Sequence, residues 1–203
     1  MNVTMVVGMV CWLTLATASA AVAQSAGSTV AATLQQEEER ARSYFTNLEL
    51  TNQHGETVRF YDDVLKDKVV VINFIFTNCK GACPLITHKL TLVRDGLEGK
   101  IGNPIQFVSL SLDPERDTPA AMKEFAKTHN ADHEGWVFLT GKSENLDNII
   151  KRLGEFTDDL EAHSTMMLVG NVKSAHWMKV LPHELPPQII QKLELLMEDN
   201  EIS

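Results

Sequence analysis

The stretch at residues 69–76, VVVINFIF, constrains the fold more than any other part of the chain. All but one of its residues are β-branched or aromatic, which favours a β-strand. A strand without alternating polar residues needs protein on both of its faces, as in the centre of an α/β sheet. We therefore predict that residues 69–76 form the central strand of a sheet that helices cover on both sides.

Strand and helix patterns alternate around this central strand. Polar turn residues at 52–55 separate two short strand patterns and predict a β-hairpin over 48–60. Thr118 and Pro119 mark a helix start, as N-cap and first helical residue. The remaining patterns predict strands at 105–112, 136–139, 165–169 and 175–180, the last two joined by a turn at Gly170 and Asn171, and helices at 85–97, from 119, from 143 and at 185–197. This order predicts an α/β, thioredoxin-like fold with a central mixed sheet, flanking helices and an N-terminal β-hairpin.

The N-terminal residues form a targeting segment. Residues 5–16 are apolar, and Ala21-Val22-Ala23 is typical of a signal-peptidase site. The segment at 1–23 is therefore either a cleaved signal peptide or a membrane anchor, because it is also just long enough to span a bilayer. Residues 24–43 are predicted to be a flexible tether and residues 44–203 a single folded domain. We expect an exported protein, either periplasmic or tethered to the outer face of the inner membrane.

The negative charge of the chain argues against one class of partner. The net charge is −9, and no charged residue precedes Glu37. An acidic domain repels the phosphate backbone, so the sequence argues against nucleic-acid binding.

Two cysteines follow the central strand, in the sequence Cys79-Lys80-Gly81-Ala82-Cys83-Pro84. They come where a strand leads into a helix, and in open α/β sheets ligands bind at the carboxyl ends of the strands. The positive end of the helix dipole favours a thiolate there. A disulfide across so short a loop constrains the unfolded chain little, so a metal site or a redox couple is the better interpretation than a structural disulfide.

A histidine far along the chain is the best candidate for a third ligand. Soft sulfur ligands select Cu(I), and one further ligand completes trigonal coordination. His163 precedes a predicted central strand, and in thioredoxin-like folds the turn entering that strand faces the cysteine loop. Asp113 and Asp117 lie in the predicted loop before residue 119. For Asp117 we favour a purely structural role in the turn, whereas the role of Asp113 stays open.

These motifs, in this order, resemble those of the Sco/SenC copper-binding proteins. The resemblance extends from about residue 44 to the terminal helix and rests on 69–76 with Cys79 and Cys83, on SLDPERDTP at 111–119, and on His163-Ser164-Thr165. It implies a thioredoxin fold, one copper ion, Cu(I) or Cu(II), held by Cys79, Cys83 and His163, and a role in maturing the dinuclear copper centre of cytochrome c oxidase. Asp113 and Asp117 match acidic positions of the family motif near the site, which would place Asp113 beside the ligands. The partner would be the copper-site subunit of that oxidase or another exported copper or thiol protein.

The same cysteines permit a second function. Some members of the family act as thiol reductants, and a dithiol with one low-pKa cysteine can exchange disulfides with a partner. Cys79 and Cys83 would then form a redox-active disulfide. The three residues between them favour metal binding, since redox enzymes usually have two. We therefore expect a non-enzymatic copper chaperone, with a thiol-disulfide oxidoreductase as the alternative.

Overall fold

The computed structural model describes residues 33, 35–97, 99–155 and 165–199. The chain divides into two units, residues 1–39 and residues 40–203. In the first unit, the described residues 33 and 35–39 are helical. Across the described parts of both units, no helix combines the length and the apolar character needed to cross a membrane. The elements below all belong to the second unit.

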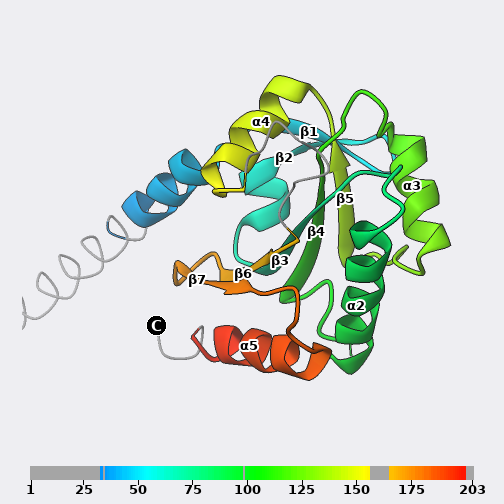
Figure 1. The fold of residues 1–203 in the computed structure, drawn as a ribbon. Helices are drawn as coiled ribbons and strands as arrows, with labels where there is room; N and C mark the ends of the chain where they lie inside the picture. The colour runs from blue at the N-terminus through cyan, green and yellow to red at the C-terminus, as the bar shows by residue number, and fades with distance from the viewer. Residues whose placement is uncertain (1–32, 34, 98, 156–164, 200–203) are drawn as a thin grey trace, which may run out of the picture. The chain divides into compact units, whose positions relative to one another are not determined.

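A seven-stranded mixed sheet forms the centre of the second unit, with the strands in the order β2-β1-β5-β4-β3-β6-β7 (Figure 1). The strands β3, β4 and β5 run parallel, while β1, β2, β6 and β7 pair antiparallel with their neighbours. The strands are β1 (Glu49–Asn52), β2 (Thr57–Arg59), β3 (Val69–Ile75), β4 (Ile105–Ser111), β5 (Trp136–Thr140), β6 (Met167–Asn171) and β7 (His176–Val180). The helices are η1 (Phe60–Leu65), α2 (Ala82–Gly96), α3 (Pro119–Thr128), α4 (Ser143–Arg152) and α5 (Pro186–Glu198).

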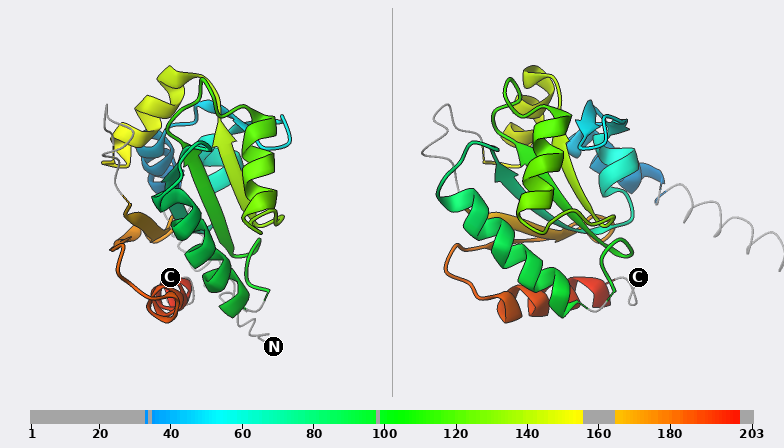
Figure 2. Two further views of the ribbon diagram at one scale, coloured as in Figure 1. Left: turned by 45° about the vertical axis from the view of Figure 1, so that its right-hand side comes forward. Right: turned by 90° about the vertical axis from the view of Figure 1, so that its right-hand side faces the viewer.

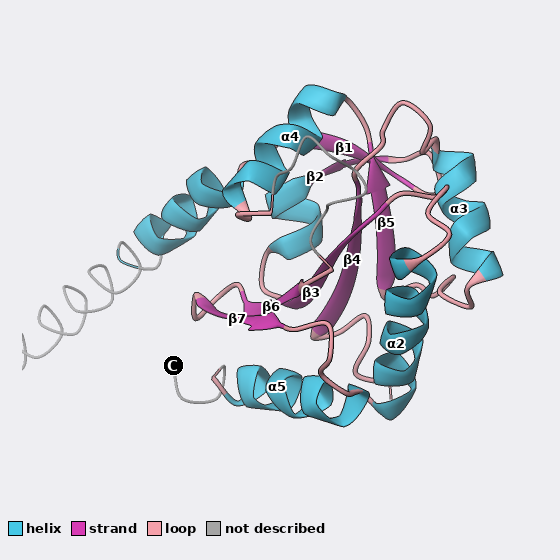
Figure 3. Cartoon of the chain, in the orientation of Figure 1, coloured by secondary structure: helices cyan, strands magenta, loops and turns pink. Residues whose placement is uncertain are grey.

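Helices cover both faces of this sheet (Figures 2 and 3). Every residue of β3 is buried. Its alternate residues face two separate apolar clusters. Val69 and Val71 pack in the cluster with α2, α3 and α5. Val70 and Ile72 pack in the cluster with α4 and η1. The prediction of a central strand and of the thioredoxin-like α/β class is confirmed.

Local capping explains where α3 begins. The hydroxyl of Thr118 accepts a hydrogen bond from the backbone N–H of Ala121 at 3.2 Å, and Pro119 occupies the first turn. A side-chain oxygen at the N-cap satisfies one of the N–H groups that the first turn leaves without an intrahelical partner. The predicted helix start is therefore confirmed, and it fixes α3 beside the loop that leaves β4.

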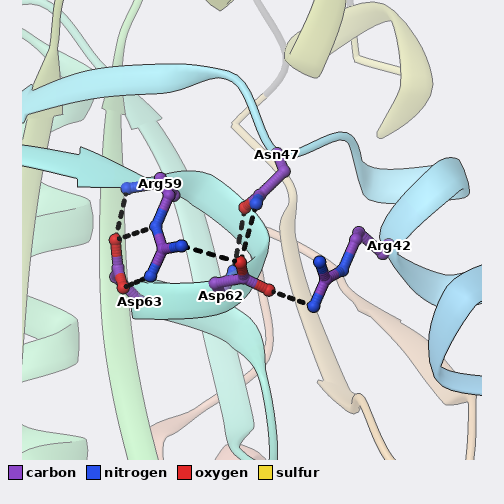
Figure 4. Close-up of polar contacts among 5 residues, drawn as sticks. All are labelled: Arg42, Asn47, Arg59, Asp62 and Asp63. Atoms are coloured by element: carbon purple, nitrogen blue, oxygen red, sulfur yellow. Dashed lines mark hydrogen bonds and ion pairs between the residues drawn. The ribbon is translucent and has the colours of Figure 1, made fainter. Parts of the chain in front are cut away.

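A polar network fixes the chain that leads into the sheet (Figure 4). The carboxylate of Asp62 in η1 pairs with Arg42 at 2.8 Å and with Arg59 at 3.2 Å. Asn47 donates to the same carboxylate at 2.8 Å and accepts the backbone N–H of Asp62 at 3.0 Å. Asp63 binds the guanidinium of Arg59 through both oxygens, at 3.0 and 2.8 Å, which is the bidentate geometry that carboxylates favour.

The turn between the last two strands differs from the prediction. The sequence predicts a turn at Gly170 and Asn171, but both residues belong to β6, and the turn comprises residues 172–175. Gly170 pairs with Trp177 of β7, and a Cβ atom at Gly170 would collide with the indole ring. Glycine is needed here because an aromatic ring lies over its Cα, and the sequence pattern does not reveal that contact.

We predict that Gly170→Ala lowers the free energy of unfolding by about 1–3 kcal/mol, because the added methyl group forces the indole ring out of place. Urea unfolding of the single variants and of the double variant with Trp177→Leu measures this effect. In the Trp177→Leu background, the cost of Gly170→Ala should largely disappear. An equal cost in both backgrounds would show that the ring is not the cause.

Candidate metal and thiol site

The two cysteines meet at the N-terminus of α2. Cys79 lies in the loop after β3, and Cys83 lies in the first turn of the helix. The backbone N–H of Cys83 points to the sulfur of Cys79 at 3.4 Å. Cys83 is fully buried and Cys79 is partly exposed, and both are present as thiols rather than as a disulfide. The structure therefore brings the two predicted sulfur ligands together, with only one of them accessible to a partner.

Their surroundings make the two thiols chemically unequal. Burial opposes ionisation of Cys79, but hydrogen bonds from Cys83 and from the backbone of Gly81 and Ala82 outweigh it and lower the Cys79 pKa. Burial raises the pKa of Cys83 to about 12, and the hydrogen bond with Cys79 and the negative charge of Asp117 add to that rise. Cys79 is thus the more acidic thiol of the pair, and Cys83 keeps its proton at neutral pH.

The proposed third ligand, His163, lies outside the described residues, so its position stays a prediction. The register of β6, the strand that follows His163 in the sequence, is relevant to this prediction. This strand runs antiparallel to β3, with Leu168 opposite Ile72. β6 therefore begins at the end of the sheet where β3 leads into the cysteine loop. Among the residues that the structure does describe, no group of three His, Cys, Asp or Glu side chains is arranged to hold a metal ion.

A buried carboxylate connects the cysteine loop to the neighbouring loop. Asp117 is fully buried, and its Oδ1 accepts hydrogen bonds from the backbone N–H of Thr77 at 2.9 Å and from the Thr77 hydroxyl at 2.6 Å. Its Oδ2 accepts the hydroxyl of Ser111, the last residue of β4, at 2.6 Å. Thr77 lies two residues before Cys79. The carboxylate therefore fixes the start of the cysteine loop to the end of the adjacent strand.

Asp113, the acidic residue that the sequence left open, lies at the edge of this arrangement. Its carboxylate pairs with the exposed guanidinium of Arg116 at 3.0 Å, and its backbone N–H donates to the Ser111 hydroxyl at 3.0 Å. Sequence reasoning assigned Asp117 to the turn alone and did not identify Thr77 or Ser111 as its partners. The available signal was that Thr77 and Ser111 come at the carboxyl ends of neighbouring strands and that Asp117 lies in the loop that follows Ser111.

We predict that Asp117→Ala lowers the free energy of unfolding by about 2–4 kcal/mol, because it leaves the Thr77 and Ser111 donors buried without an acceptor. Asp113→Ala, in the same motif, is the matched control. It should cost less than about 1 kcal/mol, since its partner Arg116 is largely exposed. Urea unfolding measures both values, and equal losses for the two variants would contradict the assigned role of Asp117.

Comparison with known proteins places this site in a family. The SCO1/SenC family profile matches residues 35–198. The SCO1 protein homolog of Bacillus subtilis (strain 168) is 36% identical over 94 residues, which are 46% of this chain and 47% of that protein. The chain thus matches about half the length of this curated relative.

Solved structures agree in fold. A SCO1/SenC family lipoprotein from Bacillus anthracis str. Ames has a TM-score of 0.65 and 29% identity, covering 75% of this chain and 94% of that one. Bradyrhizobium japonicum ScoI with copper bound has a TM-score of 0.61 and 23% identity, covering 73% and 96%. BsSco, described with a disulfide switch as a member of the Sco family of cytochrome c oxidase assembly proteins, has a TM-score of 0.64 and 24% identity, covering 75% and 92%. With a family profile that matches most of its length, the chain belongs to the SCO1/SenC family.

Proposed function

We propose that this protein binds one copper ion through Cys79, Cys83 and His163 and delivers it during assembly of the dinuclear copper centre of cytochrome c oxidase. The observation that carries the proposal is the proximity of Cys79 and Cys83 at the N-terminus of α2, where the Cys83 backbone N–H points to the Cys79 sulfur and the two side chains interact. Copper is the cargo of this protein. The ScoI structure with copper bound shows that a protein of this fold can hold the metal.

The chemistry of the donor set favours copper, and Cu(I) in particular. Thiolate sulfur is a soft ligand, and two thiolates with one imidazole suit a three-coordinate Cu(I) ion. Binding requires both cysteines to lose their protons, so copper must displace the proton that Cys83 retains at neutral pH. Cys79 is the natural first contact, because it is accessible and ionises more readily.

The location and the partner belong to the same proposal. We propose that the protein is exported and acts in the periplasm or tethered to the outer face of the inner membrane. The relative from Bacillus anthracis is described as a lipoprotein, which supports a tethered protein. The partner would be the copper-site subunit of the oxidase or another exported copper or thiol protein. BsSco is described as a member of a cytochrome c oxidase assembly family, which supports the first of these.

Competition for Cu(I) with a chromophoric chelator, under anaerobic conditions, tests the ligand set. The full chain carries Cys11→Ser, so that Cys79 and Cys83 are its only thiols. We expect one Cu(I) per chain and loss of that binding in Cys79→Ser and in Cys83→Ser. His163→Ala should weaken binding by at least about tenfold, equivalent to about 1.4 kcal/mol.

The matched control is His183→Ala, which removes an exposed imidazole from the loop before α5 and should leave copper affinity unchanged. If His163→Ala binds copper as tightly as His183→Ala does, the three-ligand proposal is wrong. Retained binding in both cysteine variants would also reject the sulfur ligands.

The inequality of the two thiols favours a second candidate function, thiol-disulfide exchange with an exported partner. The Cys79 thiolate would attack a partner disulfide, form a mixed disulfide and release one partner thiolate. Cys83 would then lose its proton and attack the Cys79 sulfur, which releases the second partner thiol and leaves the Cys79–Cys83 disulfide. The description of BsSco as having a disulfide switch supports this alternative.

The reduction potential of the Cys79–Cys83 pair separates a reductant of partner disulfides from a purely metal-binding dithiol. Exchange with glutathione redox buffers, followed by mass spectrometry of alkylated thiols, measures it. A dithiol that reduces a partner disulfide needs a potential well below the range of about −180 to −120 mV that exported disulfide oxidants have. A value inside that range would contradict the reductant function, because the Cys79–Cys83 pair would then stay reduced and available to copper.

A further inference from the structure

A groove runs from Cys79 along the neighbouring helix. Its volume is about 470 Å³. One wall is the cysteine loop with Cys79 and Lys80, and the other wall is α3. Both α3 and the start of α2 pack on the same side of the sheet (Figures 1 and 2). Cys79, the partly exposed cysteine of the site, therefore lines a concave surface that the copper ligands alone do not explain.

The wall on α3 has the spacing of a single helical face. Its lining residues are Ala121, Glu124, Phe125, Thr128 and His129. Positions separated by three, four, seven and eight residues form a stripe along a helix. At a rise of 1.5 Å per residue, this stripe is about 12 Å long. An extended peptide advances about 3.3 Å per residue, so roughly four residues of a partner chain match the groove.

The groove combines an apolar base with charged rims. Phe125 is buried, and its ring lies 4.3 Å from the imidazole of His129, measured between ring centroids. Burial lowers the pKa of His129, which keeps this ring neutral at neutral pH. Glu124 on α3 and Lys80 on the cysteine loop are both exposed at the edges. Such a surface suits the backbone and side chains of a peptide better than a compact ion.

We propose that this groove binds the extended segment of the target protein that flanks the target's cysteine. A basic side chain of that segment would lie beside Glu124. The inference rests on the proposed function, in which Cys79 meets a copper or thiol protein. Two observations support a peptide as the occupant. Cys79 lines the groove, and the exposed carboxylate of Glu124 on its α3 wall complements a basic side chain.

The rate of a single disulfide-exchange step tests whether a peptide binds in the groove. The protein carries Cys11→Ser and Cys83→Ser, which leaves Cys79 as its one thiol. The Cys79 thiolate attacks the peptide sulfur of a mixed disulfide between a cysteine peptide and thionitrobenzoate. A disulfide forms between Cys79 and the peptide, and coloured thionitrobenzoate leaves with the electron pair of the broken bond. The symmetric bis(thionitrobenzoate) disulfide undergoes the same step without a peptide and serves as the small reference reagent.

Filling the groove should slow only the peptide reaction. Thr128→Trp and Ala121→Trp place a large ring on the α3 wall at two separate positions. For each, we expect the rate with a ten-residue peptide to fall by about tenfold relative to the rate with the small reagent. Thermal unfolding confirms that each variant is folded. If neither tryptophan changes this rate ratio, the peptide does not use the groove and the proposal is wrong.

Charge reversal at the rim tests the choice of peptide. A peptide with lysines on both sides of its cysteine should react faster than a peptide with glutamates there. Glu124→Lys should shift the ratio of these two reaction rates toward the glutamate peptide by about two- to fivefold. The matched control is Glu144→Lys on α4, which packs on the opposite face of the sheet and should leave the ratio unchanged. Equal shifts in both variants would show that net charge alone causes the effect, and would contradict a specific role for Glu124.

Copper binding keeps this inference separate from the proposed function. The tryptophan variants with both cysteines intact should bind Cu(I) as tightly as the unmodified chain. If they do and the peptide rates are unchanged, only the groove proposal fails. If the unmodified chain itself binds no copper, the proposed function fails, whatever the peptide rates show.

Discussion

The buried carboxylate of Asp117 is the interaction on which the geometry of the thiol site depends. Removing a carboxylate from water is costly unless hydrogen bonds replace its hydration. Here three donors do so: the backbone N–H and hydroxyl of Thr77, and the hydroxyl of Ser111. Thr77 begins the loop that carries Cys79, and Ser111 ends the neighbouring parallel strand. The polar contact thus fixes the cysteine loop to the rigid centre of the sheet.

The same carboxylate contributes to the chemical difference between the cysteines. Its negative charge adds to burial in keeping Cys83 protonated, while the N-terminus of α2 favours the thiolate of Cys79. A soft metal ion that displaces the remaining proton gains two sulfur ligands. A partner disulfide would meet Cys79 first, because Cys79 is partly exposed and Cys83 is buried. The two proposed functions, metal binding and thiol exchange, would therefore use one asymmetric pair.

Local patterns predicted the parts of the fold that depend on neighbouring residues. The apolar run of β3 identified a central strand, and Thr118 with Pro119 identified the start of α3. Features that depend on contacts between distant residues were not predictable in this way. The interpretation of Gly170 as a turn residue was wrong because its reason is the ring of Trp177 on the next strand. Leu85 matched the apolar spacing of α2, yet it is 71% exposed.

For the candidate site too, local sequence patterns were predictive and contacts between distant residues were not. The sequence placed Cys79 and Cys83 at the start of a helix, and the structure confirms this position. It assigned Asp117 to the turn alone and left the role of Asp113 open, because only the fold shows which carboxylate reaches Thr77.

X-ray absorption at the copper edge of the Cu(I)-loaded chain carrying Cys11→Ser is the most direct test of the central claim. The account predicts two sulfur atoms and one imidazole nitrogen around a single copper ion. A copper shell without sulfur, or one unchanged in His163→Ala, would contradict it.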